Sequence, residues 1–93
     1  MAIGIRIEFV GVTQEQFDTA HDQINPERTA PAGLVFHLSG PIDGGWRVID
    51  VWESRDDFEA FAARIQEGMA AAGIELSAPP QVEEFAVHEL IRS

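Results

Sequence analysis

Residues 34–54 read LVFHLSGPIDGGWRVIDVWES, and this stretch decides the fold. Two runs of alternating side chains, residues 34–39 and 46–53, flank a segment from Gly40 to Gly45 that is dense in turn-forming residues. Alternation with a period of two is typical of strands, and a turn between two such runs predicts an antiparallel hairpin. We expect Gly40 to pair with Gly45 across it.

The segment before the hairpin predicts a strand and a helix. Residues 3–10 alternate isoleucine and phenylalanine with other side chains, as a strand with one buried face does. Thr13 followed by Gln16 forms a capping box, after which apolar side chains recur at helical spacing until Asn25-Pro26. We therefore expect a strand over 3–10, a helix over 14–24 and a loop over 26–33.

The segment after the hairpin predicts a second helix and a last strand. Ser54 and Asp57 form another capping box, and Gly73 ends the apolar stripe that follows. The stripe consists of Phe58, Phe61, Ala62, Ile65, Met69 and Ala72. Beyond Pro79-Pro80, residues 82–91 alternate again and predict a strand.

The resulting order is β-α-β-β-α-β within one domain, residues 1–93. With right-handed crossovers, this order folds as an α+β, ferredoxin-like domain: a four-stranded antiparallel sheet in order 4-1-3-2 with both helices on one face. The other face of the sheet then needs a cover or a function.

Alternation predicts which side chains share each face of the sheet. The helix-facing set is expected to be Ile3, Ile5, Ile7, Phe9, Leu34, Phe36, Leu38, Arg47, Ile49, Val51, Phe85, Val87 and Ile91. The uncovered set is expected to be Arg6, Glu8, Val10, Val35, His37, Ser39, Trp46, Val48, Asp50, Trp52, Glu84, Ala86 and His88. Because tryptophans and charges mix in the second set, we expect it to form a homodimer interface that encloses a polar pocket.

Composition limits the partners. The net charge is −10 and the pI is about 4.4, which disfavours nucleic acid and anionic membranes. Cysteine is absent, so thiolate metal sites and cysteine nucleophiles are excluded. No run approaches the roughly 20 apolar residues of a membrane span, and we expect a cytoplasmic protein.

The chain resembles the dimeric α/β-barrel superfamily. The resemblance rests on the order of the elements, on residues 34–41 and 45–54, and on the helix that carries Phe58 and Phe61. Within this superfamily, the chain resembles the antibiotic-biosynthesis-monooxygenase-like families. The resemblance implies two sheets packed face to face in a homodimer and a pocket between sheet and helices or within the barrel. It also implies cofactor-independent oxygenation of aromatic polyketides or, in other members, haem degradation by an asparagine, tryptophan and histidine set.

The sequence differs from the residue patterns associated with both of these chemistries. It has no tyrosine, and its only asparagine, Asn25, falls in the loop after the first helix. No catalytic residue is therefore carried over from the family. We expect no cofactor.

Three residues of the predicted polar face are candidates for catalysis. A histidine can accept or donate a proton near neutral pH, and His37 lies across the hairpin from Asp50, whose carboxylate could orient its ring. His88 is expected on the same face. Alternatively, each imidazole only satisfies a hydrogen bond at the dimer interface. A metal site built from His37, His88 and Glu84 has no supporting local spacing, so we expect no metal.

Four further residues are candidates for binding a small organic substrate. Trp46 and Trp52 could stack on a planar ligand, or anchor the dimer instead. Arg6 could orient a substrate oxygen, or form an ion pair with Glu8, Glu84 or Asp50. Glu84 completes the set, whereas His21 is expected to be a boundary residue without chemistry.

Four functions fit this fold. The leading one is a homodimer that binds an aromatic or polyketide-like molecule and performs cofactor-independent oxygenation or proton transfer on it. The second is a non-catalytic ligand-binding or interaction module. An RNA-binding domain of the RRM kind is disfavoured by the negative charge, and an amino-acid-binding module of ACT type remains open.

Overall fold

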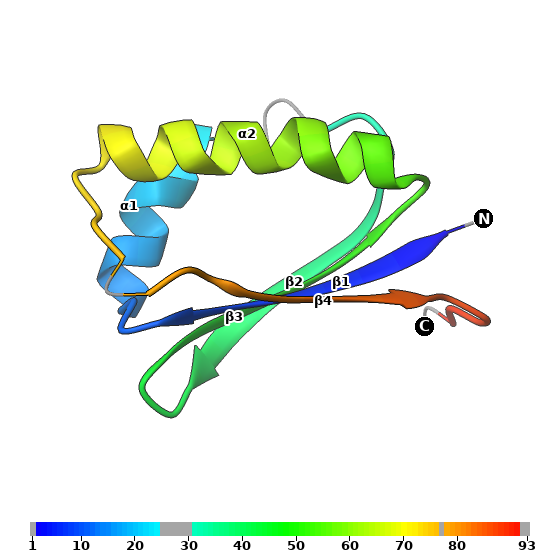
Figure 1. The fold of residues 1–93 in the computed structure, drawn as a ribbon, viewed down its shortest axis with the longest axis horizontal. Coiled ribbons are helices and arrows are strands. Elements are labelled where there is room, and N and C mark those ends of the chain that lie inside the picture. The colour runs from blue at the N-terminus through cyan, green and yellow to red at the C-terminus, as the bar shows by residue number, and fades with distance from the viewer. Residues whose placement is uncertain (1, 25–30, 77, 92–93) are drawn as a thin grey trace.

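The computed structural model describes residues 2–24, 31–76 and 78–91. Its elements follow the predicted order (Figure 1). They are β1 (Ile3–Val10), α1 (Gln14–Ile24), β2 (Leu34–Ile42), β3 (Gly45–Trp52), α2 (Arg55–Ala71) and β4 (Gln81–Ala86). The predicted end of the first helix at Asn25-Pro26 and most of the predicted loop 26–33 lie outside the described residues.

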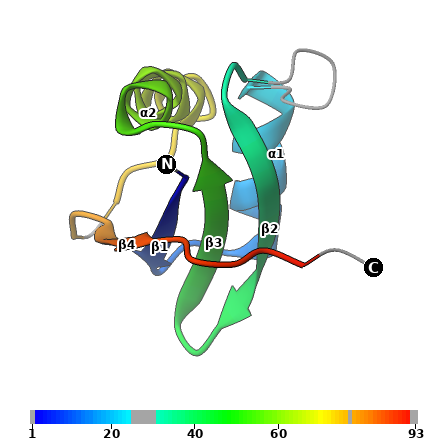
Figure 2. The same cartoon turned by 90° about the vertical axis from the view of Figure 1, so that its right-hand side faces the viewer.

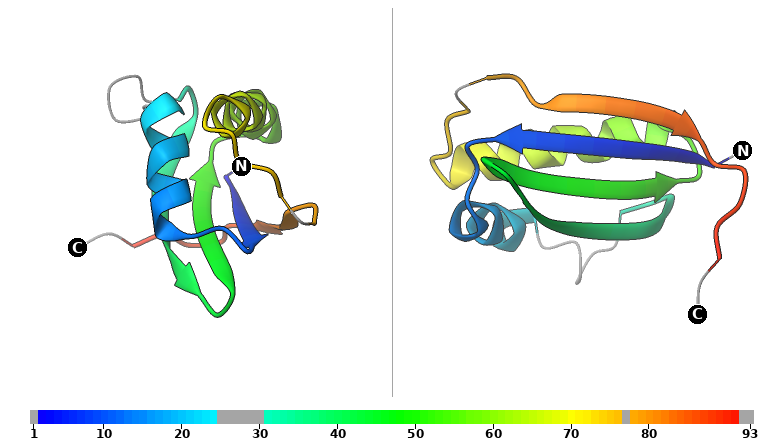
Figure 3. Two further views of the ribbon diagram at one scale, coloured as in Figure 1. Left: turned by 90° about the vertical axis from the view of Figure 1, so that its left-hand side faces the viewer. Right: turned by 90° about the horizontal axis from the view of Figure 1, so that it is seen from below.

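The four strands form one antiparallel sheet in the order β2-β3-β1-β4, which confirms the predicted topology. Both helices cover the same face (Figures 1 and 2). Seen from below in the right-hand view of Figure 3, the other face of the sheet is bare. The helices also pack on each other at Gly68, where an added Cβ would lie 2.6 Å from Cγ1 of Ile24.

Local capping sets where both helices begin. The backbone N–H of Gln16 donates to Oγ1 of Thr13 at 3.1 Å, and the backbone N–H of Thr13 donates to Oε1 of Gln16 at 3.0 Å. At α2, the backbone N–H of Asp57 donates to Oγ of Ser54 at 3.2 Å. These bonds satisfy backbone groups that a helix start leaves without partners.

The predicted hairpin register is wrong by two residues. Ile42, not Gly40, pairs with Gly45. The turn is the tight Asp43-Gly44 pair, and Gly44 supplies the positive φ of 74° that such a turn requires. A shift of two residues preserves the alternation of side chains, so His37 still shares a face with Asp50.

The predicted faces of β2, β3 and β4 are largely inverted. The helix-covered face carries Ile3, Ile5, Ile7, Phe9, Leu34, His37, Ser39, Trp46, Val48, Asp50, Trp52, Glu84 and Ala86. The bare face carries Phe36, Leu38, Arg47, Ile49, Val51 and Phe85, beside the correctly predicted Arg6, Glu8 and Val10. Of the residues predicted to face the helices, Leu34 and the β1 set do so.

Burial of the two tryptophans explains the inversion. Trp52 is fully buried and Trp46 nearly so, and each indole removes a large apolar area from water. The free energy gained by burying both indoles against the helices outweighs the cost of burying the Asp50 carboxylate. That cost is reduced because the carboxylate has a hydrogen-bonding partner in His37. The sequence argument treated Asp50 as a mark of the exposed face.

The last strand is shorter than predicted, because β1 offers no partner beyond Ile3, which pairs with Ala86. A single further bond joins the backbone N–H of Val87 to the carbonyl of Ala2 at 3.2 Å. His88 and Ile91 therefore lie outside the sheet, and Ile91 is 78% exposed.

Candidate functional site

The hairpin sets His37 on β2 directly opposite Asp50 on β3. Nδ1 of His37 lies 2.5 Å from Oδ1 of Asp50. Asp50 is 1% exposed and is the one buried charged side chain among the described residues, whereas the His37 side chain is 31% exposed. The contact between His37 and Asp50 that the sequence predicts is present in the structure. Its role in catalysis stays a prediction.

This contact assigns the two nitrogens of the His37 ring. An ionised carboxylate can only accept a hydrogen bond, so Asp50 in that form favours the neutral tautomer of His37 with the proton on Nδ1 and the lone pair on Nε2. Oδ2 of Asp50 has no hydrogen-bond partner in the described part of the chain. Among the described residues, His37 is therefore the one side chain that forms a hydrogen bond with this buried carboxylate.

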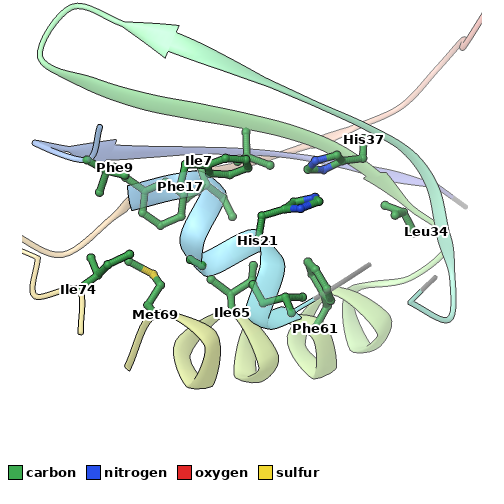
Figure 4. A pocket seen from close by; sticks show the side chains of 14 residues that line it. Ile7, Phe9, Phe17, His21, Leu34, His37, Phe61, Ile65, Met69 and Ile74 are labelled. Carbon is green, nitrogen blue, oxygen red and sulfur yellow. The ribbon is translucent and has the colours of Figure 1, made fainter. Parts of the chain in front are cut away.

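A cavity of about 100 Å³ lies between the sheet and the helices, beside this pair. Figure 4 shows side chains from β1, β2, α1 and α2 around it. Its wall is apolar except for two imidazoles, those of His37 and His21. Ile7, Phe17 and Phe61 represent the rest of the lining. A ligand here would contact mostly apolar side chains and would meet the His37 side chain at one side.

Neither tryptophan lines this cavity. Trp46 stacks on Phe17 with ring centroids 5.0 Å apart, and Trp52 packs on Phe61 at 5.4 Å. Both Phe17 and Phe61 do line the cavity, so the tryptophans support its aromatic wall from behind. Their indole Nε1 atoms have no hydrogen-bond partner among the described residues.

Arg6, one of the predicted binding residues, lies away from the cavity, on the bare face of the sheet. It forms ion pairs with Glu83 at 3.5 Å and with Glu8 at 4.0 Å, and not with Glu84 or Asp50. The prediction that Arg6 shares a face with His37 and Asp50 is wrong, because β3 turns its tryptophan-bearing face to the helices.

Glu84 and His88 do not line the cavity either. Glu84 ties β4 to α2: Nε of Arg55 donates to Oε1 at 2.8 Å, and a second N–H donates to Oε2. These hydrogen bonds lower the pKa of Glu84 and raise the pKa of Arg55. His88 is exposed beyond the end of β4, so it cannot share a strand face with His37.

Solved structures share the fold of this protein along nearly the whole chain. A Chloroflexus aurantiacus protein assigned to the antibiotic biosynthesis monooxygenases superposes with a TM-score of 0.71 at 13% identity, over 99% of this chain and 98% of that one. SnoaB, a cofactor-independent oxygenase from Streptomyces nogalater, superposes with a TM-score of 0.64 at 16% identity, over 99% of this chain and 97% of that one. A dimeric ferredoxin-like protein from Thermobifida fusca superposes with a TM-score of 0.67 at 18% identity, over 94% of this chain and 92% of that one.

The chain has the fold of the antibiotic biosynthesis monooxygenase-like proteins. This confirms, for the fold, the resemblance seen in the sequence. No family model matches the chain, and no curated protein matches its sequence significantly.

Within this antibiotic biosynthesis monooxygenase-like fold, sequence reasoning missed His21. It was expected to be a boundary residue, yet its ring lines the cavity from α1 (Figure 4). Phe17, Ala20, His21 and Ile24 recur at helical spacing, and all four line the cavity. Placing His21 on the buried side of this stripe would have found it.

Two further observations concern cofactors and membranes. The described residues contain no group of three or more histidine, aspartate or glutamate side chains arranged to hold a metal ion. Neither α1 nor α2 combines the length and the apolar character that crossing a bilayer requires.

Proposed function

We propose that this protein is a homodimer that binds a small aromatic or polyketide-like molecule in the cavity and removes a proton from it with Nε2 of His37. The observation that carries the proposal is the His37–Asp50 pair at the wall of an apolar cavity. A base held by a buried carboxylate and facing a water-poor space suits abstraction of a proton from a weak carbon or oxygen acid.

Asp50 would act as the positioning residue. Its carboxylate keeps the proton of the neutral ring on Nδ1 and stabilises the imidazolium that forms when Nε2 takes the substrate proton. The electron pair of the broken bond stays on the substrate as an enolate or phenolate. Such an electron-rich anion is the species that can react with dioxygen without a metal or flavin. The likeness of fold to SnoaB, a cofactor-independent oxygenase, supports this extension.

The bare face of the sheet supports the homodimer. Its exposed large apolar side chains are Val10, Leu38 and Phe85, and the partly buried Phe36 and Ile49 lie on the same face. Leu38 is 44% exposed and Phe85 is 42% exposed. Such an apolar surface on one face of a sheet is typical of an interface, and the Thermobifida fusca protein of the same fold is described as dimeric.

Solvent exchange tests the proposed chemistry. Cyclohexanone, an uncharged ring with exchangeable α-protons, is incubated with the protein in deuterium oxide, and proton NMR follows the loss of the α-proton signal. We expect the protein to accelerate exchange, and His37→Gln to reduce the protein-dependent rate about 100-fold or more. Asp50→Asn should also reduce it, because the amide no longer holds the same tautomer.

His88→Gln is the matched control, since it removes an imidazole that lies outside the cavity. Oxygen uptake with hydroquinone, measured in parallel, separates oxygenation from simple proton transfer. If His37→Gln exchanges cyclohexanone as fast as the unmodified protein, His37 is not the base. Binding of cyclohexanone without any protein-dependent exchange would instead favour a non-catalytic ligand-binding protein.

A further inference from the structure

A row of four alternating charges crosses the bare face of the sheet, the face seen in the right-hand view of Figure 3. Arg6 on β1 lies opposite Glu83 of β4, with its Nη2 atom 3.5 Å from Oε2 of that glutamate. Glu8, further along β1, lies opposite Arg47 of β3, whose Nε donates to its Oε2 at 3.0 Å. Nε of Arg6 lies 4.0 Å from Oε2 of Glu8, which joins the two pairs. From β4 to β3, the row therefore runs Glu83, Arg6, Glu8, Arg47.

The row is electrically neutral in a chain whose net charge is −10. The excess negative charge lies elsewhere, and much of it is on the helices. Their exposed acidic side chains are Glu15, Asp18, Asp22, Asp56, Glu59 and Glu67. Two copies that met through their helices would bring like charges together, which opposes association. At the bare face, positive and negative side chains balance.

A row of this kind is complementary to a second copy of itself in one orientation. In a dimer with twofold symmetry, the same surface of both copies forms the interface. If the second row runs in the reverse order, Glu83 faces Arg47 of the partner subunit, and Arg6 faces Glu8 of the partner subunit. If both rows run in the same order, each side chain faces its own counterpart and like charges meet. Only the reverse order brings opposite charges together at every position.

The charges of the row are not fully used within one chain. The Arg6 side chain is 43% exposed and donates no hydrogen bond to another described residue. Ion pairs with this exposure contribute little to the stability of a single chain. Beneath a second copy they would lose water, and opposite charges on that copy would offset this cost. The neighbouring apolar side chains of Leu38 and Phe85 supply attraction, whereas charges set the orientation and the choice of partner.

We propose that this row sets the orientation of the homodimer. Two copies pack through their bare faces with the rows in reverse order, so that each arginine meets a glutamate of the second copy. The inference rests on the homodimer of the proposed function and adds the residues that choose its partner and its orientation. The alternation of charge also selects against the same-order dimer, because that dimer would bring like charges together.

Three charge variants test this orientation. Arg6→Glu/Arg47→Glu makes the row all acidic, Glu8→Arg/Glu83→Arg makes it all basic, and the four changes together invert it. Light scattering and native mass spectrometry at micromolar concentration measure which dimers form. We expect the acidic and the basic variants each to dimerise at least about tenfold more weakly than the unmodified protein, and an equal mixture of them to form the heterodimer. The inverted row alternates again, so that variant should form a homodimer.

A mixture of the inverted variant with the unmodified protein reports the orientation itself. In the reverse order, these two rows bring like charges together, so we expect only homodimers after the subunits have exchanged. At about 1 M salt, where the Debye length is about 3 Å, this selection should weaken and heterodimers should form. Glu59→Arg/Glu67→Arg is the matched control: it changes the net charge as much as the basic variant does, but on α2, and should leave the homodimer unchanged.

Thermal unfolding shows whether each variant is folded. The inverted row keeps its ion pairs within the chain, so this variant carries the test if the other two unfold. Homodimers of the acidic or basic variant as tight as those of the unmodified protein would overturn the inference, and so would heterodimers of inverted and unmodified chains at low salt. In either case the homodimer of the proposed function stands. A monomeric unmodified protein would contradict that homodimer and this inference together.

Discussion

Nδ1 of His37 lies 2.5 Å from Oδ1 of Asp50, and this contact joins the edge strand β2 to the interior strand β3 on the helix-covered face of the sheet. The carboxylate is 1% exposed. It is tolerated there because the imidazole donates to it. The His37 side chain also lines the cavity, and the proposed chemistry uses its other ring nitrogen.

Replacing His37 with leucine should lower the free energy of unfolding by about 2–3 kcal/mol, because Asp50 is then buried without its partner. Urea unfolding measures the change. The double variant His37→Leu/Asp50→Leu should be more stable than the single one, since it removes the orphaned carboxylate as well. A single variant as stable as the unmodified protein would mean that the pair contributes nothing to the fold.

Replacing Leu38 with lysine should halve the molecular mass measured by light scattering at micromolar concentration. Leu38 is 44% exposed on the bare face, and a charge there opposes burial against a second copy. Val82→Lys is the matched control: Val82 is 56% exposed but belongs to the helix side of β4, where it pairs with Ile7. A monomeric unmodified protein would contradict the proposed dimer itself.

Trp52→Ala should reduce the free energy of unfolding by about 3–5 kcal/mol. Trp52 is fully buried and packs on Phe58 and Phe61 of α2, so its removal leaves a large void between β3 and that helix. Ile91→Ala, at a side chain that is 78% exposed, should change stability by less than about 0.5 kcal/mol. Similar denaturation midpoints for the two variants would argue against the observed packing.

The Arg55–Glu84 pair should make the free energy of unfolding depend on pH in the acidic range. Hydrogen bonds from Arg55 hold the folded-state pKa of Glu84 below its ordinary value, so the pair stabilises the fold when Glu84 is ionised in both states. That contribution is lost as the pH falls through the folded pKa, below the ordinary glutamate value of about 4.3. Urea midpoints of the unmodified protein and Glu84→Gln should therefore differ at neutral pH and converge in acid. A constant difference would exclude this pair as the source.

Local patterns were enough to predict several elements. The strand over 3–10 and the helix over 14–24 were correct because alternation, the Thr13–Gln16 capping box and helical spacing act within a few residues of each other. The His37–Asp50 contact was also predictable, because an even shift of register keeps both side chains on one face.

The sequence by itself determined the order of the elements, the strand topology and the face shared by His37 and Asp50. Only the tertiary structure decided which face of β3 meets the helices, since that depends on how β1 pairs with β3 and on where the two indoles find most burial. It also decided that His21 completes the cavity and that Arg6 and His88 lie away from it. These are outcomes of long-range packing, in which the burial of Trp46 and Trp52 outweighs the local preference of one paired carboxylate for water.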